Sequence, residues 1–162
     1  MMSTDKKEGI NFLVKARQGS RCKYSYDNKI LELEGMLPKE DVYPEDYGII
    51  LQTTHDNGKP LDGFLLTDES IEPGAIVEAR PTASIRTKEN GIKNDKVLLV
   101  PCAESNFNNR SHKKESFEEI KDFIRRLGQI KGEEIEIKGS FGSDEAIRLI
   151  NHCKKIYKRR KE

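Results

Sequence analysis

A change of pattern after Cys102 is the feature that most constrains the fold of this chain. Before it, short apolar segments rich in β-branched and aromatic residues alternate with turn residues, from INFLV at residue 10 to KVLLVP ending at Pro101. Segments of this length and composition are typical of β-strands. After it, two longer segments have helical periodicity. Many short strands followed by two helices predict an α+β fold, most simply a small closed β-barrel with both helices packed outside.

The two helices are predicted from their start signals and apolar faces. Ser116 and Glu119 form a capping box, and Gly128 is expected to end that helix. Ser143 is expected to cap the second helix, in which an apolar stripe follows helical spacing: Ala146, Ile147, Ile150, Cys153 and Tyr157. In the strand region, Pro81 predicts a bulge or an edge.

The length of 162 residues fits one domain with one core, and we expect a flexible N-terminus over 1–9, a domain over 10–157 and a basic tail over 158–162. The sequence contains no apolar run of about 18 residues, so no membrane-spanning helix is expected, and no signal peptide is recognised. The cysteines are three and scattered, which favours reduced thiols and a cytoplasmic location. The histidines are also scattered, and His55 and His112 are expected at the surface.

Several motifs, in order along nearly the whole chain, resemble the soluble inorganic pyrophosphatases, the single-domain magnesium-dependent family. The segments that carry the resemblance are QGSRCKYSYD, YPEDYG, NGKPLDGFLL, IEPGAIVEARP, KVLLVP and KGSFGSDEAIRLI. The resemblance implies a five-stranded OB-like barrel flanked by two C-terminal helices, often assembled as a hexamer. It also implies hydrolysis of pyrophosphate by clustered carboxylates that hold several Mg²⁺ ions, which activate a water and neutralise the leaving phosphate.

Most of the carboxylates that this resemblance implies are replaced. The metal signature D-G-D-P-x-D appears here as NGKPLD, so Asn57 and Lys59 stand at aspartate positions and only Asp62 is retained. The next two aspartate positions carry Glu89, which could still bind a metal, and Asn94. An ammonium about 4 Å from a dication repels it by several kcal/mol at moderate dielectric. We therefore do not expect a multi-magnesium centre.

Other positions of the implied site change as well. Two acidic positions carry Lys15 and Ser25, an arginine position falls near Gly35, and a late Tyr-Lys pair aligns with Leu127 and Gly128. The residues retained from the implied site are Lys23, Tyr43, Tyr47, Asp62 and Lys96.

This balance predicts a pyrophosphatase homologue that has lost hydrolysis and binds phosphate or a nucleotide directly through lysines, without a cofactor. The predicted phosphate-binding residues are Lys15, Lys23, Tyr43, Tyr47, Lys59 and Lys96. The homologue would act as a homo-oligomer, a hexamer by resemblance, or in assembly with other subunits. The alternative is an active Mg²⁺-dependent diphosphatase that uses Tyr43, Asp62 and Glu89, with help from Asp56.

Plainer interpretations stand beside these. Tyr43 and Tyr47 could be aromatic caps on the barrel, Asp62 a turn residue, and Lys59 a solvent-facing lysine. Lys23 and Lys96 fall inside strand patterns, where an inward-facing ammonium requires an anion. The basic stretch from Lys154 to Lys161 fits a solvated helix end better than a nucleic-acid site, so we do not expect nucleic acid as a partner.

Overall fold

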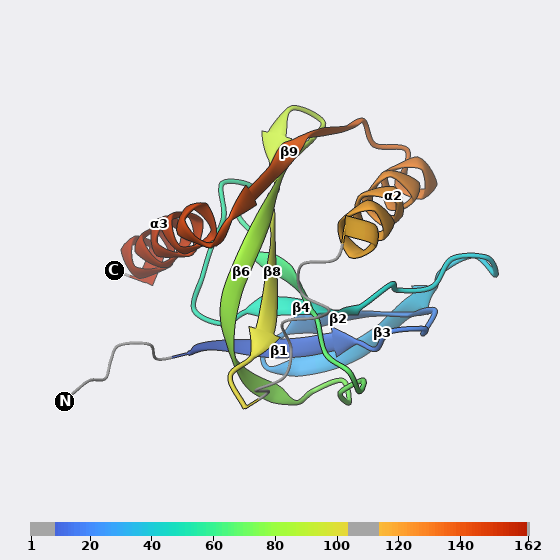
Figure 1. Cartoon of the computed structure of the whole chain (residues 1–162), viewed down its shortest axis with the longest axis horizontal. Coiled ribbons are helices and arrows are strands. Elements are labelled where there is room, and N and C mark those ends of the chain that lie inside the picture. The colour runs from blue at the N-terminus through green and yellow to red at the C-terminus, as the bar shows by residue number, and fades with distance from the viewer. Residues whose placement is uncertain (1–8, 104–113, 162) are drawn as a thin grey trace.

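The strands of the first hundred residues close into a β-barrel in the computed structural model, which describes residues 9–103 and 114–161 (Figure 1). In order around the barrel the strands are β1 (Ile10–Ala16), β4 (Asp46–Ile50), β5 (Asp62–Leu65), β8 (Lys96–Pro101) and β6 (Ile76–Glu89). Pairing of β1 with β6 closes the barrel. The pairing of β5 with β8 is parallel and the others are antiparallel. The predicted five-stranded barrel is confirmed.

Four of the strands that the structure describes lie outside the barrel. Strands β2 (Cys22–Asp27) and β3 (Ile30–Met36) form a separate two-stranded hairpin. Asn28 and Lys29 in its turn both have positive φ, which matches the turn geometry that two-residue hairpin loops require. Strands β7 (Ile92–Lys93) and β9 (Ile135–Gly142) pair antiparallel with the C-terminal half of the long strand β6. The predicted bulge at Pro81 is confirmed by a register shift between Pro81 and Ala83.

Helix α2 (Lys114–Lys131) begins before the predicted cap at Ser116 and runs beyond the predicted end at Gly128. Gly132 directly follows the helix and has a φ of 72°, and the backbone amides of Gly132 and Glu133 donate to the carbonyls of Gln129 and Gly128. This is the Schellman arrangement of a helix C-terminus. Gly128 is needed for another reason, because a Cβ there would lie 2.1 Å from Cγ1 of Ile135 in β9. Close packing of helix on strand, rather than helix termination, explains this glycine.

Helix α3 (Ser143–Lys161) begins where predicted and includes residues 158–161, which were predicted as a tail. Of the predicted apolar stripe, Ala146, Ile150 and Cys153 are buried, whereas Ile147 is 44% exposed. No helix within the described residues is long and apolar enough to cross a membrane. Residues 1–8, most of the polar connector with His112, and Glu162 lie outside the described residues.

The buried side chains form two clusters, and each helix completes one of them. Successive residues of β8 alternate between the clusters, so that both faces of this strand are covered. Helix α2 contributes Ile120, Phe123 and Ile124 to the first cluster. Helix α3 contributes Ala146, Ile150 and Cys153 to the second. The two helices lie on either side of β9 (Figure 1).

Candidate functional site

Asp62 stands at the centre of a polar group on the barrel. It begins β5 and is the direct register partner of Lys96, which begins the parallel strand β8. The Lys96 Nζ lies 3.0 Å from Asp62 Oδ2, and the hydroxyl of Tyr47 on β4 donates to the same oxygen at 2.6 Å. The side chains of Lys96 and Asp62 are only 7% and 17% exposed, so this is a largely buried ion pair.

The protonation states of this group follow from its partners. Burial alone would raise the pKa of Asp62, but the Lys96 charge, the hydrogen bonds from Tyr47 and Lys96, and the Lys15 charge lower it. Burial and then the Asp62 charge raise the pKa of Tyr47 well above its usual value. Asp62 is therefore an anion and Tyr47 a neutral donor at neutral pH.

Lys15 on β1 lies beside this group without a bonded anion of its own. Its Nζ is 5.9 Å from the centroid of the Tyr47 ring, and its side chain makes no hydrogen bond or ion pair with any residue that the structure describes. Burial lowers its pKa, and the positive charges of Lys23 and Lys131 lower it further, against the attraction of Asp62 and Glu34. A half-buried ammonium in this setting favours an added anion.

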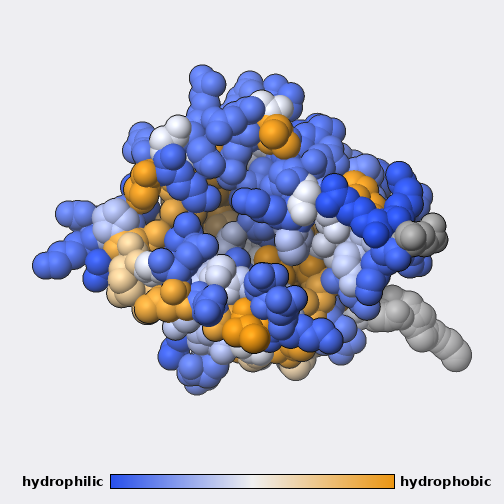
Figure 2. Space-filling view, turned by 180° about the vertical axis from the view of Figure 1, so that it is seen from behind, coloured by the Kyte–Doolittle hydropathy of each residue, from blue (hydrophilic) through white to orange (hydrophobic). Residues whose placement is uncertain are grey.

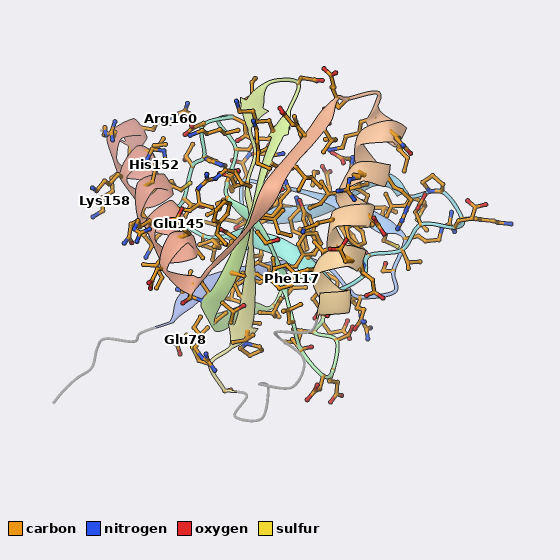
Figure 3. All side chains as sticks on the ribbon, turned by 45° about the horizontal axis from the view of Figure 1, so that its top comes forward. Glu78, Phe117, Glu145, His152, Lys158 and Arg160 are labelled. Carbon is orange, nitrogen blue, oxygen red and sulfur yellow. The ribbon has the colours of Figure 1, made fainter. Side chains whose placement is uncertain are left out.

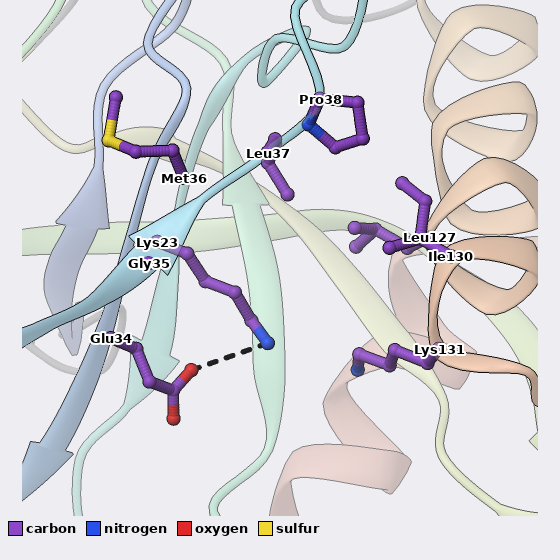
Figure 4. A pocket seen from close by; sticks show the side chains of 9 residues that line it. All are labelled: Lys23, Glu34, Gly35, Met36, Leu37, Pro38, Leu127, Ile130 and Lys131. Carbon is purple, nitrogen blue, oxygen red and sulfur yellow. Dashed lines mark ion pairs between the residues drawn. The ribbon is translucent and has the colours of Figure 1, made fainter.

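A cavity of about 350 Å³ opens next to these lysines. It lies between the hairpin β2–β3, residues 37–38 and the last turns of helix α2 (Figure 4). Lys23 Nζ in its wall is 3.3 Å from Glu34 Oε1. Gly35 and Leu127, which stand at positions where the resemblance implies charged or polar phosphate ligands, both line this cavity.

The two tyrosines belong to an aromatic cluster. Tyr43 stacks on Tyr47 with ring centroids 5.4 Å apart, and contacts Phe123 of α2 at 5.1 Å. Burial and the charges of Glu34 and Asp62 raise the pKa of Tyr43 to about 12. Both rings thus pack within this aromatic cluster, while the Tyr47 hydroxyl also donates to Asp62.

The turn that carries Asn57 and Lys59 lies against helix α3. Asn57 Oδ1 accepts a hydrogen bond from the Lys59 amide at 3.0 Å, and the Lys59 side chain is exposed. The Thr54 amide donates to the Cys153 carbonyl at 3.0 Å.

The principal charges acting on the pKa of Asp62 are Lys96 and Lys15. The structure therefore brings Lys15, Lys23 and Lys96 into one region and leaves Lys59 at the surface.

The other candidate positions are scattered around this region. Glu89 ends β6, and its charge contributes to the raised pKa of Tyr47. Asn94 is buried, and its backbone amide donates to the Thr87 carbonyl. Ser25 lies opposite Glu32 in the hairpin. Among the described residues, no three His, Cys, Asp or Glu side chains gather closely enough to hold a metal ion.

His55 corrects a prediction, because it is buried rather than at the surface, at 2% exposure. Its Nε2 lies 3.3 Å from Asp95 Oδ2 and its Nδ1 lies 3.7 Å from Asp56 Oδ1, without hydrogen-bond geometry. Asp56 in turn contacts His152 of α3 at 3.1 Å, and Figure 3 shows His152 and Arg160 along that helix. These contacts connect the turn to Asp95, which directly precedes β8, and to helix α3. No sequence signal distinguishes His55 from a loop histidine.

Lys131 is the second residue that the sequence did not reveal. It ends helix α2 and reaches the cavity from the wall opposite Lys23 (Figure 4). The helix was predicted to end at Gly128, so no predicted element carried Lys131 toward this cavity.

Comparisons with known proteins identify relatives of this chain. The model of the family described as Inorganic pyrophosphatase matches residues 12–158. An inorganic pyrophosphatase of Synechocystis is 30% identical over 158 residues, covering 92% of each chain. One of Haloferax volcanii is 30% identical over 155 residues, covering 91% of this chain and 88% of its own.

Solved structures give the same result for the fold. The inorganic phosphatase of Anaplasma phagocytophilum superposes with a TM-score of 0.87 at 23% identity, covering 96% of this chain and 97% of its own. The inorganic pyrophosphatase of Thermus thermophilus gives a TM-score of 0.85 at 25% identity, covering 98% and 96%.

Proposed function

The chain belongs to the inorganic pyrophosphatase family, and from that premise we propose that it binds a phosphate-bearing small molecule through lysines and has lost metal-dependent hydrolysis. The observation that carries the proposal is the half-buried Lys15 ammonium, which stands beside Asp62 at a position where the resemblance implies a carboxylate. It adds a positive charge where the hydrolytic chemistry needs a negative one.

The residues present do not fit the group of magnesium ions that the family resemblance implies. Mg²⁺ requires oxygen ligands in near-octahedral geometry, mainly carboxylates and waters. Asp62 is the one carboxylate of the signature that remains, and it already accepts bonds from Lys96 and Tyr47. At the other positions, Asn57 and Asn94 have neutral amides in place of carboxylates, and Lys59 has an ammonium with no oxygen ligand for a cation.

Binding of an anion is favoured by the same residues. Lys23 and Lys131 lie near enough to Lys15 for their positive charges to act on its ammonium. Phosphoryl oxygens form short charge-assisted hydrogen bonds with ammonium groups. An arriving phosphate would relieve the mutual repulsion of these lysines and pair with Lys15, which forms no ion pair with any residue in the described ranges.

Hydrolysis of pyrophosphate is the competing function, favoured by the names of the relatives at 30% identity. It would rest on Asp62 and Glu89, whose charges both act on Tyr47. For this function Asp62 would have to exchange Lys96 for a metal ion.

Phosphate release from pyrophosphate tests the proposal, with Mg²⁺ and then Mn²⁺ supplied to the purified protein. We expect none above background, together with a rise in melting temperature when pyrophosphate is added without metal. A variant with Asn57→Asp, Lys59→Asp and Asn94→Asp, alone and with Lys15→Glu, runs beside it. Turnover by the unmodified chain would overturn the loss of hydrolysis, and an unchanged melting temperature would overturn phosphate binding.

We also propose that the protein works in the cytoplasm as a homo-oligomer or with other subunits. Large apolar side chains are exposed on the hairpin, at Ile30 and Leu33. Figure 2 shows apolar residues gathered toward the lower left of one face, the side on which the hairpin lies. Such residues favour burial against another chain. The hexamer is supported by the family resemblance alone, and sedimentation of the purified protein tests it.

A further inference from the structure

The cavity between the hairpin and helix α2 has two chemically different ends. One end carries the charged side chains Lys23, Glu34 and Lys131, near Lys15. The other end is apolar, with Met36, Leu37, Pro38, Leu127 and Ile130 in the wall. Figure 4 shows Lys23 and Lys131 extending into the gap from opposite sides, and the apolar side chains beyond them.

The apolar end does not suit a bare inorganic anion. Pyrophosphate is small and highly charged, and each of its oxygens loses hydration beside an apolar wall without gaining a donor. The hydrogen-bonding side chains that the family resemblance implies here are replaced by Gly35 and Leu127. Met36 and Ile130 remain 52% and 46% exposed, so apolar surface is available for contact.

The opening at Gly35 is not required by packing. A Cβ built there would meet no atom within 4 Å, and its backbone is not in the left-handed region. A glycine at this place therefore leaves space that a side chain could have filled. The volume of about 350 Å³ lies within the usual range for organic ligands.

We propose that the cavity holds the apolar body of an organic phosphate ester, whose phosphate lies on Lys15, Lys23 and Lys131. The proposal rests on the phosphate-binding function proposed above and specifies its ligand class. The apolar body lies along Leu127 and Ile130 on one side and Met36 and Leu37 on the other. Burial of that apolar body adds to the affinity of the ligand, and inorganic pyrophosphate has no apolar group to bury.

Calorimetric titration in the absence of divalent metal tests this with two diphosphates, inorganic pyrophosphate and geranyl diphosphate. The two probes share the anionic group and differ in an apolar chain. We expect geranyl diphosphate to bind more tightly, on the order of tenfold or more. Ile130→Glu places a carboxylate on the apolar wall, and Gly35→Arg fills the opening, so either variant should remove most of that preference.

Gly142→Arg is the matched control. Gly142 in β9 also has no atom within 4 Å of a built Cβ, and it does not line the cavity. Its variant should keep the preference for geranyl diphosphate. Equal affinity of the unmodified protein for the two probes, or a preference that survives in Ile130→Glu and Gly35→Arg, would overturn the ligand class and leave phosphate binding intact. Binding of neither probe would overturn both proposals.

Discussion

Lys96 and Asp62 are register partners on the parallel strands β8 and β5, and the Nζ of the lysine lies 3.0 Å from the carboxylate of the aspartate. The sheet itself holds the two residues together, because their backbones pair at the same level of adjacent strands. The ion pair therefore does not depend on a mobile loop. A metal ion that sought Asp62 would have to displace an ammonium fixed by the barrel.

Lys96→Met should destabilise the fold by roughly 3 kcal/mol, because it leaves the Asp62 carboxylate largely buried without its cation. Denaturation in urea at neutral pH measures the change. The double variant Lys96→Met/Asp62→Leu removes both charges and should recover most of the loss. A double variant as unstable as the single one would show that packing, rather than the charge pair, accounts for the effect.

Acid should weaken the fold through Asp62. Its pKa is lowered from 3.8 in the folded state, so its contribution is complete above that value and disappears as the pH falls through the lowered pKa. The stability difference between the unmodified protein and Asp62→Asn should accordingly narrow below pH 3.8. Urea titrations at a series of acidic pH values measure it. A difference that stays constant with pH would contradict the assignment.

Binding of pyrophosphate without metal should weaken as the pH rises toward 10, because Lys15 must be protonated to hold the anion. The pKa of Lys15 is lowered from 10.5, so the loss begins below that value. Lys15→Met should reduce affinity roughly tenfold or more at pH 7 and flatten this part of the pH profile. Calorimetry at several pH values measures both effects. Lys59→Met, at an exposed position, serves as the control and should change little.

His55→Ala should cost roughly 2 kcal/mol of stability, since it removes a buried ring and leaves Asp95 without its neighbour. Asp95→Asn tests the other partner, and the double variant should show a coupling of at least about 0.5 kcal/mol. His152→Ala breaks an exposed contact and should cost less than about 1 kcal/mol. Strictly additive losses at His55 and Asp95 would rule out a direct interaction.

The barrel could be predicted from the sequence because its strands are short, apolar and separated by turn residues, and because the motifs follow one another in the family's order. The end of helix α2 could not. Gly128 is a common stop signal, but its close approach to Ile135 depends on the packing of a strand that follows later. Local sequence does not contain that contact.

Several residues of the candidate site could be named from the sequence, but their arrangement in space could not. Asp62 and Lys96 could be singled out by resemblance, yet their mutual ion pair depends on the parallel pairing of β5 with β8. His55 occupies a polar turn in the sequence, and its burial beside Asp95 depends on residues distant in sequence. Lys131 is remote in sequence from Lys23, and folding places the two residues on opposite walls of the cavity.

The division of the core between the two helices has a consequence for the newly made chain. All five barrel strands lie between Ile10 and Pro101, so the barrel can close on the ribosome before either helix emerges. At that moment both apolar clusters still lack the side chains that α2 and α3 provide. A barrel that closes at this stage exposes two apolar faces, and the nineteen residues of helix α3 cover the second of them.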